Sequence, residues 1–307
     1  MIGILCNQKD EDVLAMQIHS LLKSEVLANH SSVVVFSLQN LDLNAGVVFG
    51  STVSGQRIRQ IETALPDIIF NLSVQYKSRH IKKLRELIGL QSIVIINASN
   101  KLNQGMILDM LSSDAAARRF VLPYFRYSVY DPLCDIQGPG SLLLKPENKT
   151  GLTKITLTDT SFSGVDLSGA KCKKWLCMRV PELVKSGGIP VVIRVHLQRS
   201  PEGGWTILKR RVIPEEAEID VRAAEKADAA TLELIRLIHC FLTHLGLCYA
   251  DMIFDTGGNP YLLGFGGYDD GLLKGSDRDM QASLCRTILG YARGFTNKPN
   301  GVLNYVD

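Results

Sequence analysis

Basic and acidic side chains in the second half of the chain have the types and spacing needed to hold a triphosphate. Lys145 ends an apolar run just before a proline, Arg194 interrupts a β-branched run, and Lys209-Arg210-Arg211 form a basic cluster. Lysine and arginine bind phosphate oxygens through charge-assisted hydrogen bonds. Asp251 and Asp255 alternate with apolar residues, and an aspartate so placed can hold a magnesium ion that bridges phosphates. The competing interpretation is structural: a neighbouring arginine satisfies Asp251, and Lys209 and Arg210 are solvated.

Antiparallel strands are expected to position these side chains. Residues 189–198 form the clearest predicted strand, with Arg194, His196 and Gln198 on one face and apolar side chains on the other. A turn at 200–204 leads into a returning strand, 205–212, and a second hairpin joins 248–255 to 261–265. Between the hairpins, an apolar repeat predicts a helix that ends at Gly246 as its C-cap. This half therefore reads as an α+β domain.

The first half has a different pattern, in which short apolar runs alternate with helical periodicity. Strands are predicted around 3–5, 33–36, 67–70 and 93–96, with helices after the first strand and at 78–88. This order predicts a parallel α/β sheet covered on both faces. Asn71 and Asn97 each follow a strand, at the sheet edge where ligands of open α/β sheets bind. They define a possible small-molecule module, although asparagine is also a common turn or cap residue.

Composition excludes several classes of protein. The 307 residues carry 34 basic and 31 acidic side chains, a net charge of +3 that does not indicate a nucleic-acid partner. No export signal and no membrane-spanning run is expected, and the seven cysteines include no Cys-x-x-Cys pair. We interpret them as reduced thiols of a cytoplasmic protein. Two domains are predicted, an N-terminal α/β domain at 1–122 and a second domain at 123–307.

The order of these motifs resembles the ATP-grasp superfamily, and specifically the YheC/YheD type described as endospore coat-associated. The matching stretches are Pro66–Asn71, Ile96-Asn97, Val121–Pro123, Leu144–Pro146, Val192–Gln198, Glu202–Trp205 and Ala250–Gly258. The resemblance implies an ATP-grasp-like domain over 123–307. It implies that Lys145, Arg194, Arg211 and Met178, on the strand expected to face adenine, bind the nucleotide. Asp251 is the implied metal ligand.

The functional prediction rests on the differences between this sequence and the family pattern. In the family, a Glu-x-Asn motif supplies the main metal ligands, and in this sequence the motif falls on Gly264-Phe265-Gly266. The family's glycine-rich loop retains only Gly151, and the segment that builds the small lobe of the nucleotide clamp is shortened. Magnesium usually takes one or two carboxylates besides phosphates, so one aspartate seldom suffices. We therefore predict a non-catalytic binding or assembly component, associated with spore-coat or other proteins, without cofactor. The alternative is an ATP-dependent carboxylate–amine ligase that binds ATP and Mg²⁺, with Asp269-Asp270 as replacement ligands.

Overall fold

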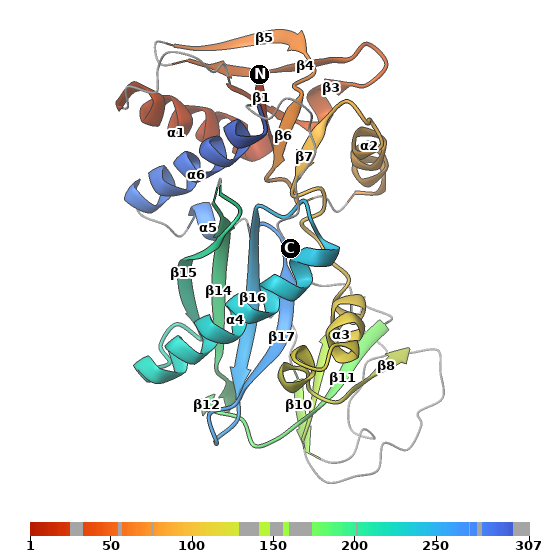
Figure 1. Ribbon diagram of the computed structural model, residues 1–307, viewed down its shortest axis with the longest axis vertical. Helices are drawn as coiled ribbons and strands as arrows, with labels where there is room; N and C mark the ends of the chain where they lie inside the picture. The colour runs from red at the N-terminus through yellow and green to blue at the C-terminus, as the bar shows by residue number, and fades with distance from the viewer. Residues whose placement is uncertain are drawn as a thin grey trace.

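The computed structural model describes residues 1–24, 33–54, 57–74, 77–128, 141–147, 156–159, 174–200, 202–269, 271–274 and 278–296. It places a mixed sheet with its helices at one end of the molecule and two antiparallel sheets at the other (Figure 1). This is the predicted combination of an α/β part with an α+β part. The loop that corresponds to the family's glycine-rich loop, residues 148–152, lies outside the described residues, and so does Asp270.

The N-terminal sheet has the strand order β3-β4-β2-β1-β6-β7, and β5 pairs with β4. Its strands are β1 (Ile2–Cys6), β2 (Val33–Ser37), β3 (Leu41–Asp42), β4 (Val47–Val53), β5 (Ile58–Ala64), β6 (Ile68–Asn71) and β7 (Val94–Ile96). Strands β2, β1, β6 and β7 run parallel, as predicted. Strands β3, β4 and β5, which the sequence pattern did not predict, join them antiparallel, so the sheet is mixed.

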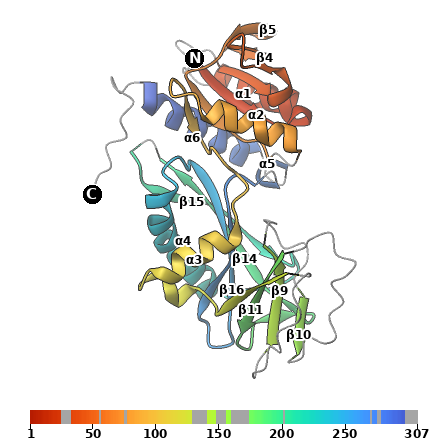
Figure 2. The same ribbon diagram turned by 90° about the vertical axis from the view of Figure 1, so that its right-hand side faces the viewer.

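Helices cover both faces of this sheet because successive strand residues point to opposite sides. One face packs against α1 (Glu11–Ser24) and α6 (Arg278–Thr296), and the other packs against Leu87 of α2 (Ser78–Ile88). The two views show α1 and α6 side by side (Figures 1 and 2). Their side chains meet through a hydrogen bond of 2.8 Å from Gln17 Nε2 to Gln281 Oε1. The last described helix thus returns to the first sheet.

Two four-stranded antiparallel sheets make up the second half. The smaller has the order β10-β9-β11-β8, formed by β8 (Tyr124–Ser128), β9 (Ser141–Pro146), β10 (Thr156–Asp159) and β11 (Lys174–Val180). The larger has the order β15-β14-β16-β17, formed by β14 (Val192–Arg199), β15 (Trp205–Ile213), β16 (Leu247–Phe254) and β17 (Pro260–Gly266). Both predicted hairpins are confirmed. A short two-stranded ribbon, β12 (Lys185–Ser186) with β13 (Ile189–Pro190), precedes β14.

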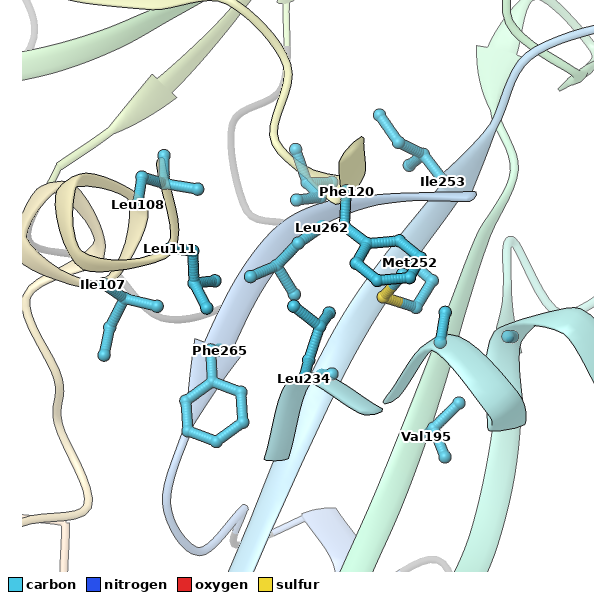
Figure 3. Packing of buried hydrophobic residues seen from close by; sticks show 14 of the residues in the cluster. Ile107, Leu108, Leu111, Phe120, Val195, Leu234, Met252, Ile253, Leu262 and Phe265 are labelled. Carbon is cyan, nitrogen blue, oxygen red and sulfur yellow. The ribbon is translucent and has the colours of Figure 1, made fainter. Parts of the chain in front are cut away.

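The apolar face of the larger sheet supports the main hydrophobic core. Val195, Met252 and Phe265 point toward Leu234 of α4 (Val221–Phe241) and toward α3 (Gln104–Ser113), as Figure 3 shows. The short helix Ala117–Phe120 adds Phe120 to the same cluster. Residues 102–122 therefore pack with the second half, while α6 packs with the first. The predicted division at residue 122 stays a prediction, because these contacts interleave the two halves.

The predicted C-cap at Gly246 is wrong. Helix α4 ends at Phe241, whose side chain is 68% exposed, and Leu242 is the cap residue. Gly246 instead lies where the two halves touch: a Cβ there would come within 2.6 Å of Ile96 Cγ2 and 2.9 Å of Phe70 Cζ. The glycine is thus required by close packing rather than by helix termination. Among the described residues, no helix is both long and apolar enough to cross a membrane.

Candidate nucleotide and metal centre

The polar face of the larger sheet gathers most of the predicted site residues. Directly opposed residues of antiparallel strands point to the same face. The register aligns Arg211 of β15, Arg194 of β14, Asp251 of β16 and Gly264 of β17 in one row. The neighbouring row consists of Lys209, His196, Tyr249 and Gly266. Alternation along four strands therefore brings together cations, an aspartate and two glycines that are far apart in sequence.

Arg194 and Asp251 form a buried bidentate ion pair in the centre of this face. Arg194 Nε donates to Asp251 Oδ1 at 2.7 Å, and Nη2 donates to Oδ2 at 2.9 Å. The third guanidinium nitrogen, Nη1, donates to Asp269 Oδ2 at 2.8 Å. Asp251 is 0% exposed and Arg194 is 8% exposed. The guanidinium carbon also lies 4.2 Å from the centre of the Tyr249 ring, in a cation–π contact.

Lys145 reaches this centre from the smaller sheet. Its side chain is 1% exposed, and its ammonium group donates to the Leu263 carbonyl at 2.9 Å. That carbonyl is available because the β16–β17 register skips Leu263, and the extra residue of a bulge is left outside the ladder. Burial lowers the pKa of Lys145 to about 8, with a further lowering by Arg194 and an opposing effect of Asp251.

Asp269 and His196 close the solvent side of the group. His196 Nε2 lies 3.1 Å from Asp269 Oδ2, and the backbone N–H of Gly271 donates to Oδ1 at 3.1 Å. Burial would raise the pKa of Asp269, but the hydrogen bond from His196 and the charge of Arg194 hold it well below its usual value. Burial likewise opposes the charge on Arg194, yet Asp251 raises the pKa of that guanidinium. Both groups are therefore charged at neutral pH.

The sequence matches no protein-family model, and no curated protein sequence matches it. Solved structures do match over nearly the whole chain. D-alanine–D-alanine ligase from Bacillus anthracis, complexed with ATP, has a TM-score of 0.58 at 12% identity, with 95% of this chain and 96% of that chain covered. N5-carboxyaminoimidazole ribonucleotide synthetase from Thermotoga maritima has a TM-score of 0.56 at 11% identity, with 94% and 75% covered. For L-amino acid ligase from Bacillus licheniformis the values are 0.52, 11%, 94% and 73%.

The chain has the ATP-grasp fold. Its predicted fold class is thereby confirmed, while the YheC/YheD type stays a prediction. In this ATP-grasp fold the polar face of the larger sheet is where the nucleotide and metal residues were predicted, so their fit to a metal ion can be examined. Magnesium demands near-octahedral oxygen coordination with free lone pairs on its protein ligands.

The described residues of this ATP-grasp fold do not fit a magnesium ion. All four carboxylate oxygens of Asp251 and Asp269 already accept hydrogen bonds, three of them from Arg194. No group of three or more His, Cys, Asp or Glu side chains suited to a metal occurs in the described part of the chain. A metal ion bound to Asp251 would therefore lie against the Arg194 guanidinium, whose positive charge opposes a second cation there.

Other side chains occupy the space beside the two glycines at which metal ligands were expected. A Cβ on Gly264 would overlap Lys145 Nζ and lie 3.3 Å from Asp251 Oδ2. A Cβ on Gly266 would lie 2.6 Å from Cζ of the Tyr249 ring. The two positions at which the resemblance implied ligand side chains are thus bordered by an inward lysine and a tyrosine. Tyr249 was missed by sequence reasoning, because one aromatic residue on a strand looks like any core position.

The remaining predicted residues lie apart from the ion pair. Met178 is 1% exposed within the main hydrophobic core, and its contact with adenine stays a prediction. Arg211 pairs with Glu215 at the surface through a contact of 2.5 Å. Asp255 ends β16 and accepts hydrogen bonds from Asn259 and Tyr261 in the hairpin turn. Arg210, interpreted as solvated, forms an ion pair with Asp228 of α4.

A buried glutamine that the sequence did not single out anchors this centre to α3. Gln104 Nε2 donates to the Phe265 carbonyl at 2.7 Å, and Gln104 Oε1 accepts from the Phe265 N–H at 2.8 Å. Through these two bonds, the Gln104 side chain pairs with the outer edge of β17 in the way that a neighbouring strand would. The position has no sequence signal, since a glutamine at a helix start is common on surfaces.

Asn71 and Asn97 do lie together, as predicted from their strand ends, but their side chains form hydrogen bonds with backbone groups. Asn71 Nδ2 donates to the Asn97 carbonyl at 2.9 Å. Asn97 Oδ1 accepts from the N–H groups of Gly246 and Leu247 at 2.6 and 2.9 Å, and Nδ2 donates to the Leu247 carbonyl at 2.8 Å. Both side chains are 0% exposed. Both asparagines therefore stabilise backbone turns, and Asn97 also connects the two halves of the molecule through its bonds to Gly246 and Leu247.

The lowered pKa of Lys145 predicts a pH-dependent stability. Between pH 8 and the usual lysine pKa of 10.5, the unfolded chain binds more protons than the native one, so stability rises with pH. The charged lysine therefore costs stability below pH 8, and the cost disappears above 10.5. At about 1.4 kcal/mol per pKa unit, the full difference is about 3 kcal/mol. Urea unfolding of wild type and Lys145→Met from pH 7 to 10 should show wild type gaining stability relative to the variant; parallel curves would contradict it.

Proposed function

We propose that this protein is a non-catalytic member of the ATP-grasp fold that acts as a binding or assembly component. The observation that carries the proposal is the commitment of every carboxylate oxygen in the centre to internal donors. Two cationic side chains, Lys145 and Arg194, face two carboxylates, Asp251 and Asp269, so charge is balanced without a ligand. Phosphoryl transfer depends almost entirely on positioned cations and metal ions. Residues held in ion pairs with one another cannot supply that positioning.

The burial of the group adds a second argument. Lys145, Tyr249 and the Arg194–Asp251 pair fill the centre of the sheet face that a triphosphate with its magnesium would need. A cavity of about 580 Å³, whose lining includes Lys209 and Arg211, lies beside them on the same face. Opening that pair leaves a buried charge uncompensated, which typically costs 3–5 kcal/mol. The binding free energy of a nucleotide would first have to offset this cost. The partners in this proposal are spore-coat or other proteins, and the location is the cytoplasm or, on the resemblance to the YheC/YheD type, the spore coat.

Nucleotide titration tests this proposal. Because anything that binds only the native state raises the melting temperature by mass action, millimolar ATP with magnesium is expected to leave the Tm unchanged relative to magnesium alone. The Bacillus anthracis ligase, whose structure was solved with ATP, is the positive control. A saturable rise in Tm that Lys145→Met abolishes would overturn the proposal.

One observation favours a second candidate, an ATP-dependent carboxylate–amine ligase. Asp269, suggested as a replacement metal ligand, turns inward and shares Arg194 with Asp251 rather than facing solvent. If Arg194 moved to a phosphate, the two carboxylates would be released together toward a metal. This reading predicts phosphate release from ATP in the presence of amino-acid mixtures, with loss of that activity in Asp269→Asn. An unchanged background rate in both proteins would reject it.

A further inference from the structure

Strand β5 forms an open edge of the N-terminal sheet. It has seven residues and pairs with β4 over its whole length without a register shift, and no other strand of the described chain pairs with it. Figure 1 shows it at the upper end of the molecule, beyond β4. Residues 59–62 are exposed to solvent. Such an edge presents unpaired backbone groups on which another chain can add a strand.

Two hydrogen bonds at the ends of the β4–β5 ladder fix which backbone groups of β5 face outward. The Ser54 N–H donates to the Arg57 carbonyl at 3.1 Å, and the Leu65 N–H donates to the Gly46 carbonyl at 2.9 Å. In an antiparallel pair, every second residue of a strand bonds to its neighbour. The odd-numbered residues of β5 therefore bond to β4, and the even-numbered residues direct their N–H and C=O groups away from the sheet.

Four residues share this outward direction of both backbone groups: Ile58, Gln60, Glu62 and Ala64. Within the described part of the chain, no hydrogen bond to their N–H or C=O groups occurs. β5 also contains no proline and no bulge, which are among the devices that natural proteins use to block an exposed edge. The edge is thus a regular row of free donors and acceptors.

We propose that two copies of this protein pair antiparallel along β5, so that their N-terminal sheets form one continuous sheet. A second copy supplies an edge with the same spacing of donors and acceptors. In the register with Ile61 on the two-fold axis, Gln60 lies opposite Glu62 of the second copy, and Ile58 lies opposite Ala64. Each of these pairs exchanges two hydrogen bonds. A register centred on Gln60 leaves Ala64 without an outward-facing partner, and one centred on Glu62 leaves Ile58 without one.

The side chains of β5 are compatible with this register. Ile61, which is 37% exposed, meets its own copy on the axis, and such cross-strand contacts between apolar side chains stabilise sheets. Arg59 lies opposite Thr63, and Glu62 lies opposite Gln60, so no two like charges face each other directly. Because both copies use the same surface, the contact closes at two copies and forms a dimer. The inference goes beyond the proposed function and does not depend on the Arg194–Asp251 centre.

Cysteine cross-linking tests the register. The background is a chain in which serine replaces Cys134, Cys172 and Cys240, while the buried cysteines remain. Ile61→Cys would place the two Cα atoms about 4.5 Å apart, within the range of a disulfide. Arg59→Cys is the matched control, because its copy lies four residues further along the strand, about 13 Å away.

Mild oxidation at micromolar protein is expected to convert Ile61→Cys into a covalent dimer and to leave Arg59→Cys monomeric. Equal cross-linking of both variants would show random collision rather than this pairing. The absence of a covalent dimer of Ile61→Cys would equally overturn the proposal.

Sedimentation equilibrium measures the dimer without cross-linking, and wild type is expected to show a monomer–dimer equilibrium. Glu62→Pro removes an outward N–H and keeps the bonds to β4, so it should fold as wild type does. The dimer loses one hydrogen bond from each copy, and its dissociation constant should rise at least about tenfold. Glu62→Ala retains the N–H and is the matched control, which should dimerise nearly as well as wild type.

The circular dichroism spectrum verifies that both variants are folded. A wild type that stays monomeric from micromolar to near-millimolar concentration would contradict the proposal, and so would a Glu62→Pro dimer as tight as that of Glu62→Ala. The ATP titration reports on the larger sheet, so a rise in Tm there would overturn the non-catalytic proposal and leave this one intact.

Discussion

Asp251→Ala is expected to lower the free energy of unfolding by about 3–5 kcal/mol, the range found when one partner of a buried ion pair is removed. Among the described residues, the variant leaves Arg194, 8% exposed, with Asp269 as its one carboxylate partner, and it removes the negative charge that raises the pKa of Lys145. The two cations would then repel each other in a largely buried space. Chemical denaturation with a shared m-value measures the loss.

Asp251→Asn is the informative companion to this variant. It keeps the size of the side chain, but its amide N–H₂ would face a guanidinium N–H, so it should cost nearly as much as the alanine. Asp228→Asn is the matched control, because its partner Arg210 has a side chain 47% exposed to solvent; the expected loss is under about 1 kcal/mol. If Asp251→Ala were neutral or stabilising, Asp251 would behave as a strained ligand-binding residue, and the structural assignment would be wrong.

Asn97→Ala is expected to destabilise the protein by roughly 3–6 kcal/mol, since each buried backbone group left unpaired costs about 1–3 kcal/mol. The variant strips partners from the N–H groups of Gly246 and Leu247 and from the Leu247 carbonyl. These groups lie where β16 begins beside the N-terminal sheet. Asn97 also has a φ of 59°, a left-handed conformation that asparagine tolerates better than alanine.

Asn97→Gly separates the two contributions. Glycine adopts positive φ without strain, so it should be less destabilising than alanine by about 1 kcal/mol, while the lost hydrogen bonds remain. Unfolding followed by both tyrosine and tryptophan fluorescence is the measurement. If both variants were as stable as wild type, Asn97 would instead be available for a ligand at the sheet edge, as one reading of the sequence suggested.

These expectations share one physical idea, which is that catalytic residue types can be retained for stability. In this centre Lys145, from the smaller sheet, meets Arg194 and Asp251, from the larger one, and all three were predicted to bind the nucleotide or its metal. The Lys145 ammonium group and the Tyr249 ring occupy the space beside Gly264 and Gly266, and the charges pair with one another. A buried pair of this kind is costly to break even where it contributes little when formed.

The sequence was a good guide wherever a property depended on local spacing. Period-two alternation around Arg194 identified β14, and apolar runs identified four parallel strands, because one face of each element must be buried. It failed where packing between distant segments decided the outcome. Gly246 looked like a helix cap, but it is required by close contact with Ile96 and Phe70, 150 and 176 residues earlier in the sequence.

The sequence by itself predicted the α/β and α+β parts from residue type and order, and its resemblance to the ATP-grasp superfamily implied the fold and placed two glycines where metal ligands were expected. It also placed Lys145, Arg194 and Asp251 on elements that could meet. Only the tertiary structure decided what those residues do when they meet. The outcome depended on which partner each buried charge finds, since desolvation forces every one of them to pair. Asp269 and the Leu263 carbonyl became partners through a loop and a bulge that no sequence period marks.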